Sequence, residues 1–97
     1  MLNITKYKEN GALTFALNGR LDTTTAPGFE EALKSSIDGV SALTLDLRGL
    51  EYISSAGLRV LLSAQKRTAG KMKVRNANET VTEIFDITGF SGILTIE

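Results

Sequence analysis

The residues of this chain best placed to do chemistry are two adjacent serines, Ser54 and Ser55. They follow an apolar stretch and precede a segment whose leucines recur with helical spacing. A hydroxyl at the start of a helix lies next to backbone N–H groups that lack partners and near the positive end of the helix dipole. Such a serine can cap the helix, and a phosphate attached to it would be stabilised there. The residues alone leave both interpretations open.

Composition removes several classes of function. The chain has no cysteine and no histidine, so a disulfide framework, a thiolate site and a Ser-His-Asp triad are all impossible. Eleven basic and eleven acidic residues give a net charge of zero, which lacks the basic excess expected of a nucleic-acid-binding protein. No apolar stretch approaches the ~20 residues needed to span a bilayer, and the N-terminus does not resemble a signal peptide. We therefore expect a cytoplasmic domain with no nucleic acid and no membrane insertion.

Two other groups of residues could carry chemistry. The run from Ser63 to Lys66 matches the S-x-x-K signature of penicillin-recognising enzymes, but no companion motif is present. We interpret it as the polar face of a helix and expect no enzymatic activity. The carboxylates Asp22, Asp46 and Glu51 could meet at the C-terminal ends of strands, where α/β sheets place their sites. A divalent metal site there is an open alternative, although solvated charges are favoured, and we expect no cofactor.

The remaining pattern predicts elements in the order β-β-α-β-α-β-α-β. Strands are expected over 4–7 and 13–17, joined by a turn at 9–11, and Gly19 should close the second of them. A helix begins near Thr24 or Thr25 with Pro27 in its first turn, and ends at Gly39. Further expected segments are a strand over 40–47, a loop over 48–51, a helix over 55–69, a strand over 72–74, a helix from Asn78 to Gly89 and a strand over 93–96.

This alternation predicts an α/β fold for residues 1–97 as one domain. Strands that alternate with helices pair in parallel, so we expect a mixed, mostly parallel sheet of about four to five strands with helices packed on it. Leu43, Leu45 and Leu47 alternate with small residues, which favours a central strand covered on both sides. Gly57 lies in the first turn of the second helix, where glycine costs ~1 kcal/mol relative to alanine. That cost suggests that another backbone must approach closely there.

The run from Ile53 to Leu62 (ISSAGLRVLL) closely resembles the signature loop and helix of STAS domains, above all those of the bacterial anti-sigma factor antagonists. Three flanking segments agree with the resemblance. Gly19–Thr23 resembles the family's G-x-L-D turn, 45–50 resembles its strand ahead of the serine loop, and 84–90 resembles its last helix and terminating glycine. The resemblance extends over essentially the whole chain.

The resemblance implies a partner-switching protein. Such an antagonist binds an anti-sigma factor that is also a serine kinase, and so frees the sigma factor. The kinase phosphorylates it and releases it, and a PP2C-type phosphatase restores the binding form. Aligned on the glycine, the family's phosphorylated serine falls on Ser55. Ser54 stands where relatives often carry aspartate, and it is the second candidate acceptor.

The expected partner-binding residues combine carboxylates that shape the kinase contact, residues of the serine loop, and residues on the exposed face of the helix that follows it. They are Asp22, Asp46, Ser54, Gly57, Arg59 and Ser63. The alternative is a STAS scaffold or ligand-sensing subunit of a regulatory or transport complex that is never phosphorylated.

Overall fold

An N-terminal hairpin forms one edge of the sheet. In the computed structural model, which describes residues 1–97, β1 (Leu2–Glu9) pairs antiparallel with β2 (Ala12–Leu21). Asn10 and Gly11 join the two strands with φ angles of 52° and 82°. Positive φ at both central residues is what a two-residue hairpin turn of type I′ requires. The predicted hairpin is confirmed, but both strands are longer than expected, and β2 continues past Gly19.

The other strands extend the sheet in parallel. β3 (Ala42–Ile53), β4 (Met72–Arg75) and β5 (Thr95–Ile96) complete a five-stranded sheet in the order β1-β2-β3-β4-β5. Each pairing after the hairpin is parallel. The predicted mixed, mostly parallel α/β sheet is confirmed. The last strand is shorter than expected, because Ile93 and Leu94 donate hydrogen bonds back to the carbonyl of Phe90.

The loop expected over 48–51 is wrong, because these residues belong to the central strand β3. Its pairing with β2 shifts register twice, and at each shift β3 holds one extra residue. Such bulges change which side chains face the core. The fully buried residues Leu47, Leu50 and Ile53 are consequently spaced by three and not by two.

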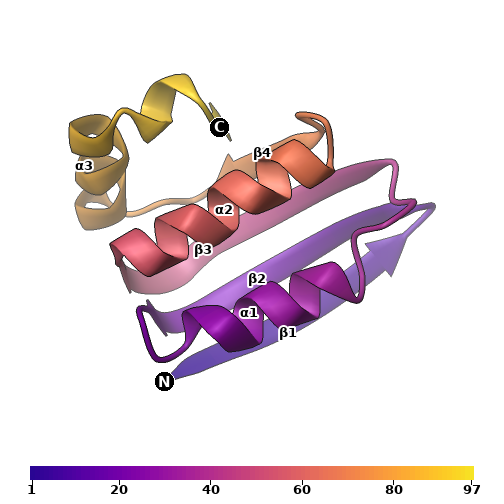
Figure 1. Cartoon of the computed structure of the whole chain (residues 1–97), viewed down its shortest axis with the longest axis horizontal. Helices are drawn as coiled ribbons and strands as arrows, with labels where there is room; N and C mark the ends of the chain where they lie inside the picture. Colours follow the sequence, from indigo (N-terminus) through magenta and orange to yellow (C-terminus); the bar gives the residue numbers. More distant parts are fainter.

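The helices cover one face of this sheet. They are α1 (Ala26–Lys34), α2 (Ser55–Arg67) and α3 (Glu79–Thr88), followed by the short 3₁₀ helix η1 (Phe90–Gly92). Figure 1 shows α1 and α2 side by side over the strands, with α3 beyond one end of α2. Their apolar faces and one face of the sheet form a single cluster of 22 buried residues. No helix is long and apolar enough to cross a membrane.

The opposite face of the sheet is open, which corrects the expectation that the central strand is covered on both sides. Thr44 and Asp46 of β3 are only half-buried, and Lys73 and Arg75 of β4 are exposed. These side chains alternate with fully buried leucines, as in a strand with one solvated face. The site therefore has to be sought on the helical face or at the strand ends.

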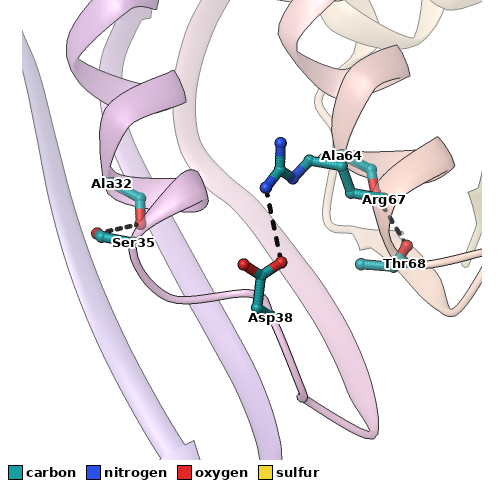
Figure 2. A network of polar contacts seen from close by, with 6 residues as sticks. All are labelled: Ala32, Ser35, Asp38, Ala64, Arg67 and Thr68. Carbon is teal, nitrogen blue, oxygen red and sulfur yellow. Dashed lines mark hydrogen bonds and ion pairs between the residues drawn. The ribbon is translucent and has the colours of Figure 1, made fainter.

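Polar contacts join the two central helices at the end away from the serines. Arg67 at the end of α2 forms an ion pair of 3.6 Å with Asp38, in the loop after α1 (Figure 2). α1 ends at Lys34, earlier than predicted, and the Ser35 hydroxyl donates to the carbonyl of Ala32. Ile37 lies beyond the helix end yet is buried. The ion pair links the loop after α1 to the end of α2, at the end opposite the groove described below.

Candidate functional site

The two serines have different surroundings. Ser54 is the N-cap of α2: its hydroxyl accepts a hydrogen bond of 3.4 Å from the backbone N–H of Gly57. Its own N–H donates to the carbonyl of Leu21 at 2.9 Å, which ties the loop to the end of β2. Ser54 is half-buried, whereas Ser55, the first residue of α2, is exposed. The capping role therefore belongs to Ser54, and the hydroxyl accessible to a partner belongs to Ser55.

Asp22 directly follows the residue that holds Ser54, so it lies beside the serine loop. Its carboxylate accepts hydrogen bonds from the Thr24 hydroxyl at 2.7 Å and the Thr24 backbone N–H at 3.0 Å. The backbone N–H of Thr25 donates to the same oxygen at 3.2 Å, and the Thr25 hydroxyl lies 3.3 Å from it. These bonds, that of the Thr24 hydroxyl foremost, lower the pKa of Asp22 despite some desolvation. Asp22 is thus an ionised, fixed carboxylate.

The threonines after Asp22 organise this loop, a role that the residue pattern did not predict. The Thr25 hydroxyl accepts from the N–H of Asp22 at 2.9 Å and donates to the carbonyl of Arg20 at 2.8 Å. Side chains of Asp and Thr that bond to nearby backbone groups organise turns and helix starts. An aspartate followed by hydroxyl residues two and three positions later is a signal that could have identified this loop.

A groove runs between the first turns of α1 and α2. Its volume is about 350 Å³, and it is lined by Thr23, Ala26, Pro27, Glu30, Ala56, Arg59 and Val60. Glu30 and Arg59 are its charged residues. Arg59 is exposed and lies one helical turn after Ser55, while Ser63, another turn further, is half-buried. Ser55, Arg59 and Ser63 therefore lie along one side of α2, and Arg59 among them lines the groove.

Gly57 does not have the role that the sequence suggested. It is buried, and a Cβ built on it would lie 2.8 Å from Cγ1 of Ile53 and 2.8 Å from Cγ of Leu21. The close approach that requires glycine is therefore that of α2 to the strands of its own sheet. The interpretation of Gly57 as a point of partner contact is corrected, because its missing side chain faces the core.

Asp46 lies away from the serine loop. It precedes Ser54 by eight strand residues, which span roughly 25 Å at the usual rise of a strand. Its carboxylate accepts from the Asn76 side chain at 2.9 Å and from the backbone N–H of Arg48 at 3.1 Å. The Asn76 bond is the main cause that lowers the pKa of Asp46, against partial desolvation. Asp46 thus belongs to the open face and does not join Asp22.

The two remaining chemical alternatives have no supporting geometry. Asp22, Asp46 and Glu51 do not converge, and no group of three or more acidic residues is arranged to hold a metal ion. Ser63 and Lys66 lie outside the groove, with Lys66 exposed on the surface of α2. The interpretation of the serine–lysine pair as part of a helix surface agrees with this position.

Comparison with known proteins adds the family. The model of the STAS domain family matches residues 3–97. BtrV of Bordetella bronchiseptica, which is named as an anti-sigma factor antagonist, is 34% identical over 98% of this chain and 85% of its own length.

Two solved structures share the fold. An anti-sigma factor antagonist from Mycobacterium paratuberculosis has a TM-score of 0.90 at 21% identity, over 99% of this chain and 85% of that one. The Bacillus cell fate determinant SpoIIAA in its phosphorylated form has a TM-score of 0.75 at 16% identity, over 98% and 91% of the two chains. The curated relatives are named as anti-sigma factor antagonists, which are regulators and not enzymes. Since the family model covers nearly every residue, this chain belongs to the STAS domain family.

Proposed function

We propose that this protein is an anti-sigma factor antagonist that acts by partner switching in the cytoplasm. In its unphosphorylated form it binds an anti-sigma factor with serine kinase activity and thereby frees the sigma factor. Phosphorylation of Ser55 releases it, and a PP2C-type phosphatase restores the binding form. The observation that carries the proposal is the separation of roles at the serine pair: Ser54 caps α2, and Ser55 presents an exposed hydroxyl beside a groove.

The chemistry of the switch requires nothing from this chain except the Ser55 hydroxyl. Its oxygen forms a bond to the γ-phosphorus of ATP, the bond from that phosphorus to the β,γ-bridging oxygen breaks, and ADP leaves. The hydroxyl proton passes to a base of the kinase. In the reverse step the phosphatase hydrolyses the ester with water and releases inorganic phosphate. The kinase and the phosphatase supply all the catalytic groups, which agrees with a non-enzymatic role for this chain.

A phosphate on Ser55 would change binding without unfolding the domain. It adds about −1.5 to −2 charges at the N-terminus of α2, where the helix dipole favours anions. A partner that docks over this surface has to desolvate the new charge, and the fixed carboxylate of Asp22 adds repulsion. Burial of an unpaired charge costs several kcal/mol, and each 1.4 kcal/mol changes affinity about tenfold. Local electrostatics is therefore sufficient for release.

The proposed contact surface is centred on the groove. It includes Asp22, Ser54, Arg59 and Ser63 around Ser55, together with the groove residues of α1. Asp46 is outside it, because its side chain lies on the open face of the sheet. The fold is compatible with phosphorylation, since SpoIIAA, which shares it, is known in a phosphorylated form.

The decisive experiment incubates the protein with its anti-sigma factor kinase and ATP and measures the intact mass. We expect an increase of about 80 Da, the mass of one phosphoryl group, and its loss in Ser55→Ala. Ser54→Ala is the matched control, since it removes the neighbouring hydroxyl and should still be modified. Stoichiometric phosphorylation of Ser55→Ala would exclude Ser55 as the acceptor. If the wild type and Ser54→Ala are both unmodified but still bind partner proteins, the scaffold alternative is favoured.

A second experiment separates the switch from a structural role of the residue. Ser55→Asp places a negative charge at the same point, so it should retain the wild-type melting temperature and lose affinity for the kinase. Ser55→Asn, which is similar in size but uncharged, should bind like the wild type. A large fall in the melting temperature of Ser55→Asp would show that the position serves stability, contrary to the proposal.

A further inference from the structure

Arg59 is the cationic side chain that stands one helical turn after the proposed acceptor. It is exposed, it lines the groove, and the ion pairs of the structure are formed by Arg67, Lys73 and Arg75. We infer that Arg59 pairs with the phosphate of phosphorylated Ser55, so that phosphorylation also withdraws this guanidinium from the partner surface. The inference rests on the proposed function for its biological meaning, although the contact itself can be tested without any kinase.

The spacing on α2 places the two groups within reach of each other. Residues four apart on a helix are neighbours, with about 5–6 Å between their β-carbons. Phosphorylation extends the serine by a phosphorus and three oxygens, and it replaces a neutral hydroxyl by an anion that attracts the guanidinium. An acidic group that precedes a basic one by four residues is also the favourable orientation. The planar guanidinium then offers two parallel N–H donors to two phosphate oxygens.

Other cations are held elsewhere or lie too far away. Arg20 stacks on the ring of Tyr52, with its guanidinium carbon 4.7 Å from the ring centre. Lys66 is on the same side of α2 as Ser55, but eleven residues later, which is roughly 16 Å along a helix. Arg67 is further still and is paired with Asp38 at 3.6 Å. Arg59 is thus the cation on α2 that a phosphate on the first residue can engage.

The acidic groups around the site determine how pairing of Arg59 with the phosphate changes the charge of the groove. Glu30 of α1 lines the groove with Arg59, and no ion pair joins them at present. Asp22 directly follows Leu21, whose carbonyl holds the serine loop, and its carboxylate disfavours a position of the phosphate close to it. When the phosphate takes Arg59, the groove keeps the carboxylate of Glu30 without a balancing cation. A partner that recognises Arg59 therefore loses a contact at the same moment as it meets a new negative charge.

The test uses protein with phosphoserine introduced at position 55 during translation, so no kinase is needed. The titration of its phosphate is followed by ³¹P NMR in the wild type and in Arg59→Gln. A nearby cation favours the dianion, so removal of Arg59 should raise the pKa of the phosphate by roughly a few tenths of a unit. Arg67→Gln is the control, because it removes the same charge from the same helix out of reach of the phosphate, and its titration should match the wild type.

Two further measurements keep the outcome unambiguous. Glutamine and arginine have similar helix propensities, so Arg59→Gln should melt like the wild type. Arg59→Lys, which retains the charge, should bring the pKa of the phosphate most of the way back to the wild-type value. Identical titrations of Arg59→Gln and the wild type would overturn the inference. So would equal shifts in the Arg59 and Arg67 variants, which would indicate a general effect of net charge. Because the phosphate is installed directly, failure here is distinguishable from failure of Ser55 as a kinase substrate.

Discussion

Replacement of Gly57 by alanine tests how α2 is placed on the sheet. A methyl group there would lie 2.8 Å from Cγ1 of Ile53, 2.8 Å from Cγ of Leu21 and 3.1 Å from Cδ2 of Leu21. Both neighbours are at most 1% exposed. The atoms in the way belong to side chains packed inside the core, so neither can move aside without disturbing others. The helix must instead shift away from the strands or force a strained rotamer.

Two opposing effects set the size of the change. Overpacking of a well-packed core costs about 1–3 kcal/mol. Alanine in place of glycine inside a helix recovers about 1 kcal/mol. The net expectation for Gly57→Ala is a loss of about 1 kcal/mol in the free energy of unfolding. For a domain of this size that corresponds to a fall of roughly 4–8 °C in melting temperature.

The chain offers a matched control in α1. Gly28 is also helical, and a Cβ built on it would have no neighbour within 4 Å. Gly28→Ala should therefore raise the free energy of unfolding, by about 0.5–1 kcal/mol. Urea denaturation of the wild type and both variants measures the two changes in the free energy of unfolding, which should have opposite signs. Equal stabilisation by both alanines would refute the argument that Gly57 lies against the core. Unchanged stability of Gly57→Ala with lost kinase binding would instead restore the view that a partner approaches this glycine.

Other consequences concern caps and carboxylates. Asn78 caps α3 through its side-chain oxygen and donates to the Leu50 carbonyl at 2.9 Å, so Asn78→Ala should cost about 1–2 kcal/mol. Ser54→Ala should cost less, about 0.5 kcal/mol, because its capping bond is long, at 3.4 Å; equal losses in urea denaturation would contradict this ranking. The pKa values of Asp22 and Asp46 are lowered from the ordinary 3.8. Their contribution to stability is therefore present above that value and lost as the pH falls below it. Asp46→Asn should unfold with a flatter pH dependence below about pH 4 than the wild type, and an unchanged slope would rule out this contribution.

The order of the elements along the chain and the starts of the helices could be predicted because each depends on local signals. The glycine-containing hairpin turn, Pro27 at the start of α1 and the cap at Asn78 all act within a few residues of their own position. Phe29 of α1 and Phe85 of α3, which are both fully buried, lie on the apolar faces that the helical spacing of each segment forms. Elements of this kind need little tertiary information.

The errors in β3 have one physical cause. Strict alternation of buried residues stops at Leu47, so the sequence placed the end of the strand there. The strand continues, because β3 accommodates one extra residue at each of its two register shifts against β2 and so carries the chain on to Leu50 and Ile53. A bulge depends on pairing with the neighbouring strand, and the local signals for it are Gly19 and Gly49, which lie next to the two register shifts. The same error displaced the site: a strand that ended at Leu47 would have put Asp46 at its C-terminal end, next to Asp22.

The separation of Ser54 and Ser55 also could not be read from residue types, since both serines are able to cap. It depends on the bond from the Ser54 N–H to the Leu21 carbonyl, which fixes the loop so that Ser54 faces the helix and Ser55 faces solvent. The consequence bears on the switch itself. If one hydroxyl both capped α2 and accepted the phosphate, each modification would change the stability of the helix start. With the cap on Ser54, a phosphate on Ser55 leaves the capping bond in place and meets the positive end of the helix dipole. Such a protein can cycle between two binding states without paying for a change of fold at either step.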